Sequence, residues 1–284
     1  MPLTSWDVPE ITTLLLEAGR IARAYYEDSS PVLKEDRTIV TKADKEIEAE
    51  LAAHFDAPKA GVYLIGEETN EDRGEDYVQG ALSGRTWVVD PIDGTSPYSH
   101  HLPHWGVSIG LMQDGRLVEG AIFLPATGEV AVTEGEDVLF GNLGCEPERW
   151  DPGAVKPLAY TPVTNPGRGI VSIAQELAKR GRFTGDYTVH AVGSCVSSAI
   201  AMLTGSFVGY IANIKLWDIG AAVPLFRNFG FSMKLADGTP YDGAVDEASF
   251  HLTPGYPDRW RMRTHLFVGR TEEVCDDILA HTRF

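Results

Sequence analysis

The feature that most constrains this chain is the stretch TWVVDPIDGTSPYSHH at residues 86–101, where an apolar run ends in two acids. The apolar residues predict a strand that ends at Asp90, and the rigid ring of Pro91 fixes the direction of the turn that follows. A turn rarely needs both Asp90 and Asp93. We therefore expect the two carboxylates and the Ile92 carbonyl to point to one side, where they offer the oxygen ligands that Mg²⁺ prefers.

Gly94 and Thr95 complete this turn. Their N–H groups can bind a phosphate oxygen, because Gly94 lets a ligand approach the backbone and a helix start favours anions. The structural alternative is an Asx-turn followed by a helix cap, with Asp93 or Thr95 as the capping residue. That alternative explains either acid alone, but the whole string favours a metal and phosphate site.

The charge balance excludes some partners. The chain has 24 Lys and Arg against 41 Asp and Glu, a net charge of −17 that repels nucleic acid and anionic membrane surfaces. No stretch approaches the roughly 18 apolar residues of a membrane span. An anionic substrate needs a local reversal of this field, which bound divalent cations supply.

The start of the chain and its cysteines indicate the compartment. The start has no basic n-region and its apolar residues have helical spacing, so we expect no signal peptide. Cys145, Cys195 and Cys275 are odd in number and widely spaced, which argues against disulfides and against a zinc ribbon. We interpret them as reduced thiols and expect a cytoplasmic protein.

The first 150 residues predict helices followed by a largely antiparallel sheet. Asp7 and Glu10 resemble a capping box before a run of apolar residues at helical spacing, and a second helix opens near Thr41. The strand-like runs are 62–65, 86–89, 107–112 and 117–123, with Asp114-Gly115 as a hairpin turn between the last two.

A proline-rich stretch between Gly144 and Gly169 is the expected boundary between two halves, residues 1–150 and 151–284. Beyond it strands and helices alternate, which predicts a three-layer α/β half. The expected elements are strand 169–173, helix 174–180, strand 187–192, helix 194–203, strand 207–211 and helix 217–229. The fold class is therefore α/β, with an α+β N-terminal half packed on an α/β C-terminal half.

The string Asp-Pro-Ile-Asp-Gly-Thr resembles the signature of the inositol monophosphatase superfamily, which includes histidinol-phosphatase and 3'-nucleotidase relatives. The resemblance runs from about Lys34 to Gly230 and implies a layered αβαβα sandwich of the inositol monophosphatase and fructose-1,6-bisphosphatase type. The other matching strings, in the family's order, are Lys34, Asp36, Val40, Thr41, Ala43 and Asp44; Gly66, Glu67 and Glu68; and Trp217 with Asp218.

The resemblance also implies a magnesium centre. Glu67, Asp90 and the Ile92 carbonyl would hold one Mg²⁺, and Asp90, Asp93 and Asp218 would hold a second. Mn²⁺ is an alternative to Mg²⁺, and Li⁺ is the expected inhibitor. Physical chemistry agrees, because crowded carboxylates repel one another unless cations neutralise them. Two metals can also hold both the entering and the leaving oxygen of a phosphoryl transfer.

Catalytic roles follow from the same resemblance. Asp44 would lie at a weaker third ion, and with Thr95 and Glu67 it would position or deprotonate the attacking water. The phosphate would lie across the metals and the amides of Gly94 and Thr95.

Several of these residues have a structural alternative. Asp44 follows Thr41 by three residues, as the acidic partner in a capping box does. Asp218 is also explained as an acid near a helix N-terminus, where the dipole favours it. Glu68 begins an acidic loop, so we expect it at the surface or behind the ligands.

Two further strings point to other chemistry. His100, His101 and His104 match no zinc spacing, so we interpret them as surface or lid residues. The string GVSIG at 106–110 fits the nucleophile-elbow pattern, which needs a strand, a sharp turn and a helix. The chain after Ser108 continues as a strand, so an ester hydrolase with a Ser108 nucleophile is disfavoured.

The substrate pocket is less constrained. In the family, Gly193 and Ser194 border the pocket, and an acid a few positions before Trp-Asp faces sugar hydroxyls. Residues 210–215 contain no acid, and a missing charged acceptor costs about 1.5–3 kcal/mol with a polyol. Inositol phosphate itself is therefore less favoured, and we expect Asn213 and Lys215 to contact a different group.

The predicted function is a Mg²⁺-dependent phosphomonoesterase that hydrolyses a small phosphorylated metabolite with metal-activated water. Histidinol phosphate and 3'-phosphoadenosine 5'-phosphate are the alternative substrates. A metal- or phosphate-binding protein with little turnover is the alternative from another class. The resemblance implies a homodimer.

Overall fold

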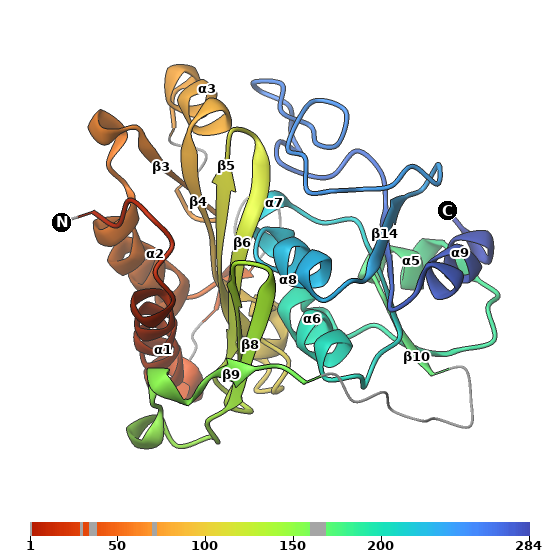
Figure 1. Ribbon diagram of the computed structural model, residues 1–284, viewed down its shortest axis with the longest axis horizontal. Coiled ribbons are helices and arrows are strands. Elements are labelled where there is room, and N and C mark those ends of the chain that lie inside the picture. The colour runs from red at the N-terminus through yellow and green to blue at the C-terminus, as the bar shows by residue number, and fades with distance from the viewer. Residues whose placement is uncertain (1, 29–30, 34–38, 70–72, 160–168) are drawn as a thin grey trace.

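The computed structural model describes residues 2–28, 31–33, 39–69, 73–159 and 169–284. Helices and sheets alternate in layers: α1 and α2, a seven-stranded sheet, α6 to α8, a five-stranded sheet, and α5 with α9 (Figure 1). This is the layered αβαβα sandwich that the sequence predicted. No helix in the described part of the chain is both long enough and apolar enough to cross a bilayer.

The first sheet has the order β3-β4-β5-β6-β7-β8-β9, in which only the β3–β4 pair is parallel. It is therefore largely antiparallel, as expected, and Asp114 and Gly115 form the hairpin turn between β5 and β6 with positive φ values. The strands are β3 (Val62–Gly66), β4 (Arg85–Asp93), β5 (Gly106–Gln113), β6 (Arg116–Leu124), β7 (Glu129–Glu134), β8 (Asp137–Asn142) and β9 (Lys156–Pro157).

Helices cover both faces of this sheet. The Asp7 side chain caps α1 by accepting the Glu10 N–H, as the sequence indicated. Along β4, Trp87 and Val89 face α1 and α2, whereas Val88 faces the middle helices, because successive side chains of a strand point to opposite faces. The outer helices are α1 (Val8–Tyr25) and α2 (Lys42–Phe55), and α3 (Glu75–Ser83) and α4 (Thr95–Ser99) flank β4 along the chain.

The second sheet has the order β12-β10-β13-β15-β14. Strands β12, β10 and β13 are parallel, and β15 runs antiparallel to both of its neighbours. Its strands are β10 (Ile170–Ile173), β12 (Thr188–His190), β13 (Gly209–Ala212), β14 (Ser232–Leu235) and β15 (Leu266–Gly269). Its helices are α5 (Gln175–Arg180), α6 (Cys195–Leu203), α7 (Leu216–Ile219), α8 (Ala222–Asn228) and α9 (Glu272–Ala280).

Short pieces complete the chain. Two small antiparallel pairs are β1 (Val32–Leu33) with β2 (Ile39–Val40), and β11 (Arg182–Phe183) with β16 (Thr282–Arg283). The expected boundary between the halves includes residues 160–168, which lie outside the described residues. Strand β9 lies beyond residue 150 yet belongs to the first sheet, and the division at residue 150 stays a proposal.

Two expectations about element ends are corrected. The single helix expected over 217–229 is wrong, because α7 ends at Ile219 and α8 begins at Ala222. The two residues between the helices, Gly220 and Ala221, keep right-handed helical dihedral angles. Gly220 packs against Val88, and a Cβ on this glycine would lie 2.7 Å from the Val88 side chain. Strand β4 does not stop at Asp90 but continues to Asp93, with a register shift between the two acids.

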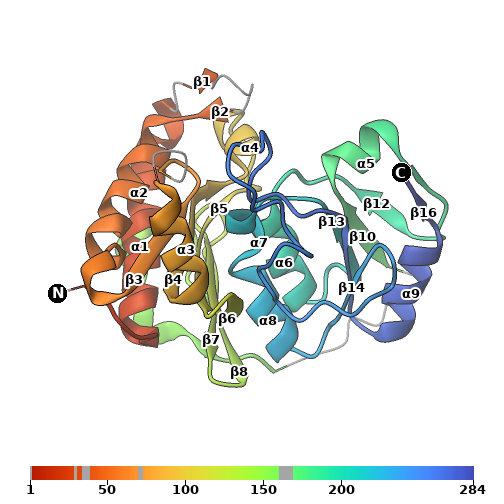
Figure 2. The same cartoon turned by 90° about the horizontal axis from the view of Figure 1, so that it is seen from above.

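Glycines let the middle helices lie directly on the first sheet. A Cβ on Gly110 of β5 would fall 2.7 Å from the backbone of Gly220, and a Cβ on Gly120 of β6 would overlap the carbonyl oxygen of Ala221. This close approach places α7 in contact with β4, near the end of that strand (Figures 1 and 2).

We predict that Gly120→Ala lowers the free energy of unfolding by about 1–3 kcal/mol, because the added methyl group must push α8 away from β6. Urea unfolding followed by circular dichroism measures this difference. Gly153→Ala is the matched control, since its Cβ would meet nothing closer than 3.4 Å. Equal stability of the two variants would contradict the close packing described here.

Candidate active site

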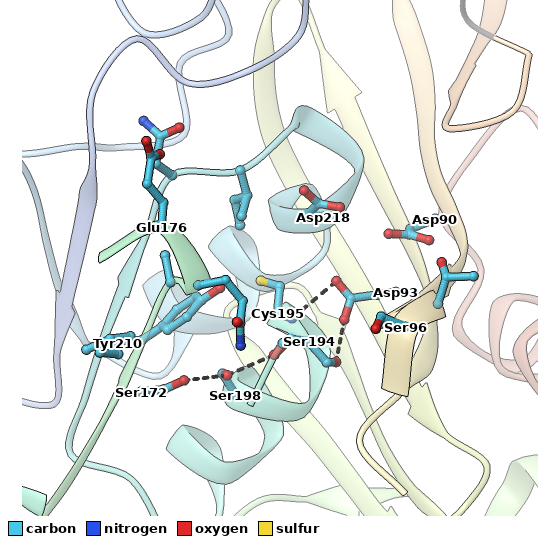
Figure 3. A pocket seen from close by; sticks show the side chains of 18 of the residues that line it. Asp90, Asp93, Ser96, Ser172, Glu176, Ser194, Cys195, Ser198, Tyr210 and Asp218 are labelled. Carbon is cyan, nitrogen blue, oxygen red and sulfur yellow. Dashed lines mark hydrogen bonds between the residues drawn. The ribbon is translucent and has the colours of Figure 1, made fainter. Parts of the chain in front are cut away.

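A cavity of about 740 Å³ opens between the two halves of the molecule. The end of β4 and the start of α4 form one wall, and β10, β13, α6 and α7 contribute the other (Figure 3). The cavity therefore lies where the first sheet, the middle helices and the second sheet meet. Residues far apart in the sequence contribute to it.

The β4 turn carries the acids predicted from the sequence. Gly94 has φ +84°, a left-handed conformation that favours glycine, and a Cβ there would lie 2.7 Å from the His104 carbonyl oxygen. Thr95 begins α4, and its hydroxyl donates a hydrogen bond to the Ile92 carbonyl oxygen at 3.1 Å. The register shift between Asp90 and Asp93 turns both acids into the cavity wall.

Asp218 joins these two acids from the other half of the chain. One carboxylate oxygen each of Asp90, Asp93 and Asp218 lies within 4.8 Å of the others. Figure 3 shows the three side chains around a common space. Asp218 is the third residue of α7, and it accepts the Lys215 N–H at 2.8 Å, so the helix cap fixes its orientation.

Asp93 is held by the N-terminus of α6. It accepts the backbone N–H groups of Cys195 and Val196, each at 3.2 Å, and the hydroxyl hydrogen of Ser194. Ser194 is the N-cap of this helix. The predicted contact residue Ser194 thus fixes an acid of the cluster as well as lining the cavity.

Burial and mutual repulsion disfavour negative charge in this cluster. Burial raises the pKa of Asp90 well above its usual value, and the charges of Glu67, Asp93 and Asp218 raise it further. Burial likewise raises the pKa of Asp93 to about 7, with Asp218 the next cause. The pKa of Asp218 is also raised, chiefly by burial. These acids become fully ionised near neutral pH only when a cation compensates them.

A divalent cation fits the donors present. The Oδ1 atom of Asp90 is buried and has no hydrogen-bond partner among the described residues. The three carboxylates of the cluster and the nearby Ile92 carbonyl offer oxygen atoms alone, which are the ligands of hard cations such as Mg²⁺. The cluster can therefore hold a divalent cation.

Glu67 lies at the cavity surface, whereas Asp44 is buried and does not line the cavity. Glu67 follows β3 and lines the cavity. Asp44 is completely buried; its Oδ2 accepts the Thr41 N–H at 2.8 Å and the Thr41 hydroxyl at 2.5 Å. The capping box expected as an alternative is therefore present. Asp44 Oδ1 has no partner among the described residues, and burial raises the pKa of this acid to about 6.

The predicted substrate residues divide into two groups. Gly94, Thr95, Gly193, Ser194 and Asn213 all line the cavity. The Lys215 side chain is not among the described residues that line it, and its Nζ lies 5.2 Å from the centre of the Trp217 ring. Its predicted role as a substrate contact stays a prediction.

The disfavoured strings behave as ordinary structure. Ser108 is a buried residue in the middle of β5, as the sequence indicated, and its hydroxyl lies 3.5 Å from the Trp217 carbonyl oxygen. His100, His101 and His104 are exposed, and no cation cluster in the described residues includes them. The three cysteines are free. Lys34 and Asp36 of the family string lie outside the described residues.

Sequence reasoning missed Glu48 and Arg261. Glu48 is almost fully buried on α2. Its Oε2 accepts the N–H of Glu68, the residue after Glu67, at 2.8 Å. A Cβ on Gly66 would lie 2.5 Å from the Glu48 carboxyl group, so this glycine makes room for it. The spacing of four residues from Asp44 on one helix was the available signal. Arg261 lines the cavity from an irregular segment that carries no such signal.

Comparisons with known proteins agree on one family. The family described as the Inositol monophosphatase family matches residues 6–262. An inositol-1-monophosphatase of Rhizobium meliloti (strain 1021) is 27% identical over 202 residues, which cover 70% of this chain and 72% of that protein. A histidinol-phosphatase of Chlorobaculum parvum is 34% identical over 138 residues, which cover 48% of this chain and 51% of that protein.

A solved structure shares the fold. The IMPase of Thermotoga maritima has a TM-score of 0.67 at 17% sequence identity, with coverage of 95% of this chain and 94% of that chain. At this identity the likeness supports the fold and not the substrate.

The raised pKa values predict how stability depends on pH without metal. Asp44 and Asp93 bind protons more tightly when folded, with pKa values of about 6 and about 7 against 3.8 for an ordinary Asp. The folded state therefore holds more protons than the unfolded state between about pH 4 and 7, so stability falls as the pH rises through this window. We expect the metal-free protein to be less stable at pH 8 than at pH 5, as measured by urea unfolding.

Asp90→Asn tests the cause of this decline. The variant removes one of the mutually repelling carboxylates, so its stability should fall less between pH 5 and pH 8 than that of the wild type. Saturating Mg²⁺ should diminish the decline in the wild type. A decline of the same size in both metal-free proteins would contradict the assignment.

Proposed function

Because the chain belongs to the inositol monophosphatase family, we propose that it is a Mg²⁺-dependent phosphatase acting on a small phosphorylated metabolite. The observation that carries the proposal is the convergence of Asp90, Asp93 and Asp218 within 4.8 Å at the wall of a cavity. Carboxylates this close together repel one another, and bound cations would remove that repulsion.

The chain offers ligands for more than one ion. Asp90, Asp93 and Asp218 would hold one Mg²⁺, and Glu67, Asp90 and the Ile92 carbonyl would hold another. Mn²⁺ is the alternative ion, and Li⁺ would inhibit by occupying one of the weaker sites. When bound, Mg²⁺ neutralises phosphate charge and stabilises the entering and leaving oxygens of the reaction.

The backbone of the β4 turn would orient the phosphate. Gly94 has a left-handed conformation at the start of α4, and the amides of Gly94 and Thr95 would donate hydrogen bonds to phosphate oxygens. No Cβ blocks this approach at Gly94. A phosphate bound in this way would present the phosphorus atom to water from one direction.

Thr95 and Glu67 would position the attacking water. The Thr95 hydroxyl gives its hydrogen to the Ile92 carbonyl oxygen, so its lone pairs remain to accept a hydrogen bond from water. Glu67 lines the cavity and would accept a proton from that water, while Asp44 would support a weaker third ion. The phosphorus–oxygen ester bond would break as the water oxygen bonds to phosphorus, and the leaving alkoxide would take a proton from solvent water while Glu67 returns its proton to solvent.

The identity of the alcohol stays a prediction. Similar proteins include an inositol-1-monophosphatase and a histidinol-phosphatase, so inositol phosphate and histidinol phosphate are the first substrates to test. The nucleotide 3'-phosphoadenosine 5'-phosphate is a third. A homodimer and a cytoplasmic location are proposed on the resemblance alone.

We predict that Asp93→Asn lowers Mg²⁺-dependent phosphate release by at least about a hundredfold, because an ion that this residue holds supplies several kcal/mol of transition-state stabilisation. Phosphate release from a panel of phosphomonoesters, with and without Mg²⁺, measures the effect. Asp137→Asn is the control, since Asp137 is exposed at the start of β8. Undiminished Mg²⁺-dependent hydrolysis by Asp93→Asn would refute the role of this acid, and no hydrolysis by the wild type would favour a binding protein with little turnover.

A further inference from the structure

The chain between β14 and β15, residues 236–265, contributes to the cavity wall although it contains little regular structure. Two of its side chains, Asp258 and Arg261, line the cavity. The segment lies against the chain that enters α7, as Figure 2 shows. The contacts are backbone hydrogen bonds from the Leu216 N–H to the Trp260 carbonyl oxygen at 2.9 Å and from the Met262 N–H to the Ile214 carbonyl oxygen at 3.0 Å.

Trp260 holds this segment in an unusual shape. Its φ is +72°, a left-handed conformation that is strained for a large side chain and persists only where the surroundings fix it. The indole ring is buried, and the Arg259 guanidinium lies 5.4 Å from its centre. Arg259 Nη2 also donates to both carboxylate oxygens of Glu75 on α3, at 3.1 and 2.9 Å. The segment is thus tied to both halves, directly beside Arg261.

The Arg261 side chain is held by its neighbours. Its Nη1 donates to the Asn213 carbonyl oxygen at 2.9 Å, and its Nε lies 3.3 Å from Asp258 Oδ1. No hydrogen bond of Nη2 is present within the described ranges, so this part of the guanidinium keeps its donors. Orientation is therefore fixed while donors remain for a ligand.

Arg261 is also distinctive in charge. It is the only lysine or arginine among the described residues that line the cavity, whereas several lining residues are Asp or Glu. Burial raises the pKa of Asp218, and the Lys215 N–H and the Arg261 guanidinium oppose that rise. Arg261 therefore acts electrostatically on the acid cluster, where the ester would be bound.

We infer that Arg261 determines specificity by binding an acidic group, a carboxylate or a second phosphate, on the alcohol part of the substrate. The inference rests on the proposed phosphatase function. A planar guanidinium fork matches carboxylate and phosphate oxygens, and it is fixed here before the ligand arrives. In a protein of net charge −17, an acidic alcohol needs such a local cation.

An alcohol with an amino group is the competing ligand. Asp258 and Glu176 line the cavity and would attract a positive charge. Each already has a basic partner: Asp258 lies 3.3 Å from Arg261, and Glu176 lies 3.8 Å from Arg180. Asp258 engages Nε of Arg261, which leaves the Nη2 donors for an acid. The acidic alcohol is therefore favoured.

Matched phosphate esters test the inference. 3-Phosphoglycerate carries a carboxylate where glycerol 3-phosphate carries a hydroxymethyl group. 3-Aminopropyl phosphate carries an ammonium group, and propane-1,3-diol bisphosphate carries a second phosphate. With Mg²⁺, we expect the wild type to hydrolyse one of the acidic esters with a kcat/KM roughly 10- to 100-fold higher than that for glycerol 3-phosphate. One charge-assisted hydrogen bond to the substrate accounts for a ratio of this size. The two acidic esters distinguish carboxylate from phosphate.

Three variants assign the preference to one side chain. Arg261→Gln should lower the ratio of kcat/KM for the acidic ester to that for glycerol 3-phosphate by at least about tenfold. Arg261→Lys should keep part of the preference, because it retains the charge without the fork. Arg263→Gln, two residues away, pairs with Glu247 outside the cavity lining and should leave the ratio unchanged. Thermal unfolding of each variant shows that it is folded.

The outcomes separate this inference from the proposed function. Hydrolysis without preference, a preference for the ammonium ester, or a preference that survives Arg261→Gln would overturn the role of Arg261 and leave the phosphatase intact. Calorimetry measures binding of any ester that the wild type does not hydrolyse. Arg261-dependent binding of the acidic ester without turnover would contradict the proposed phosphatase function and support the binding role of Arg261. Equal binding of all esters without turnover would contradict both proposals.

Discussion

The repulsion among buried carboxylates is the constraint on which the rest of this structure depends. Asp90 and Asp93 leave the end of β4, and Asp218 reaches them from α7 in the other half of the chain. Burial raises the pKa of all three, and neighbouring carboxylates raise the pKa of Asp90 and Asp93 further, so full ionisation needs a compensating cation. Cations resolve the conflict. A fold that places acids in this way at a cavity wall can bind divalent ions, and the proposed phosphate chemistry depends on them.

Packing between layers makes the arrangement possible. Because Gly110 and Gly220 have no side chains in the way, the middle helices lie directly on the first sheet and bring Asp218 to the end of β4. The N-terminus of α6 compensates Asp93 with two N–H groups. The same junction receives the 236–265 segment, which adds Arg261 to the cavity. In the proposed function, the turn after β4 would hold the phosphate, and the opposite wall with Arg261 would contact the alcohol.

Sequence reasoning succeeded where chemistry is local. The Asp90 to Thr95 turn carries its own geometry in Pro91 and Gly94, and the caps at Asp7 and Thr41 are set within one helical turn. Long, periodic elements such as α1 and α2 were predicted for the same reason. The break between α7 and α8 was not, because Gly220 and Ala221 keep right-handed helical dihedral angles and no proline marks the end of α7. Arg261 was missed because tertiary contacts alone bring its irregular segment to the cavity.

The most direct test is anomalous diffraction from crystals soaked in Mn²⁺ and phosphate, since Mn²⁺ can take the oxygen ligands of Mg²⁺ and its position is measured independently of the protein atoms. The account predicts an anomalous peak at coordination distance from carboxylate oxygens of Asp90, Asp93 and Asp218, with phosphate beside the Gly94 amide. Well-ordered carboxylates with no peak among them, at saturating Mn²⁺, would contradict it.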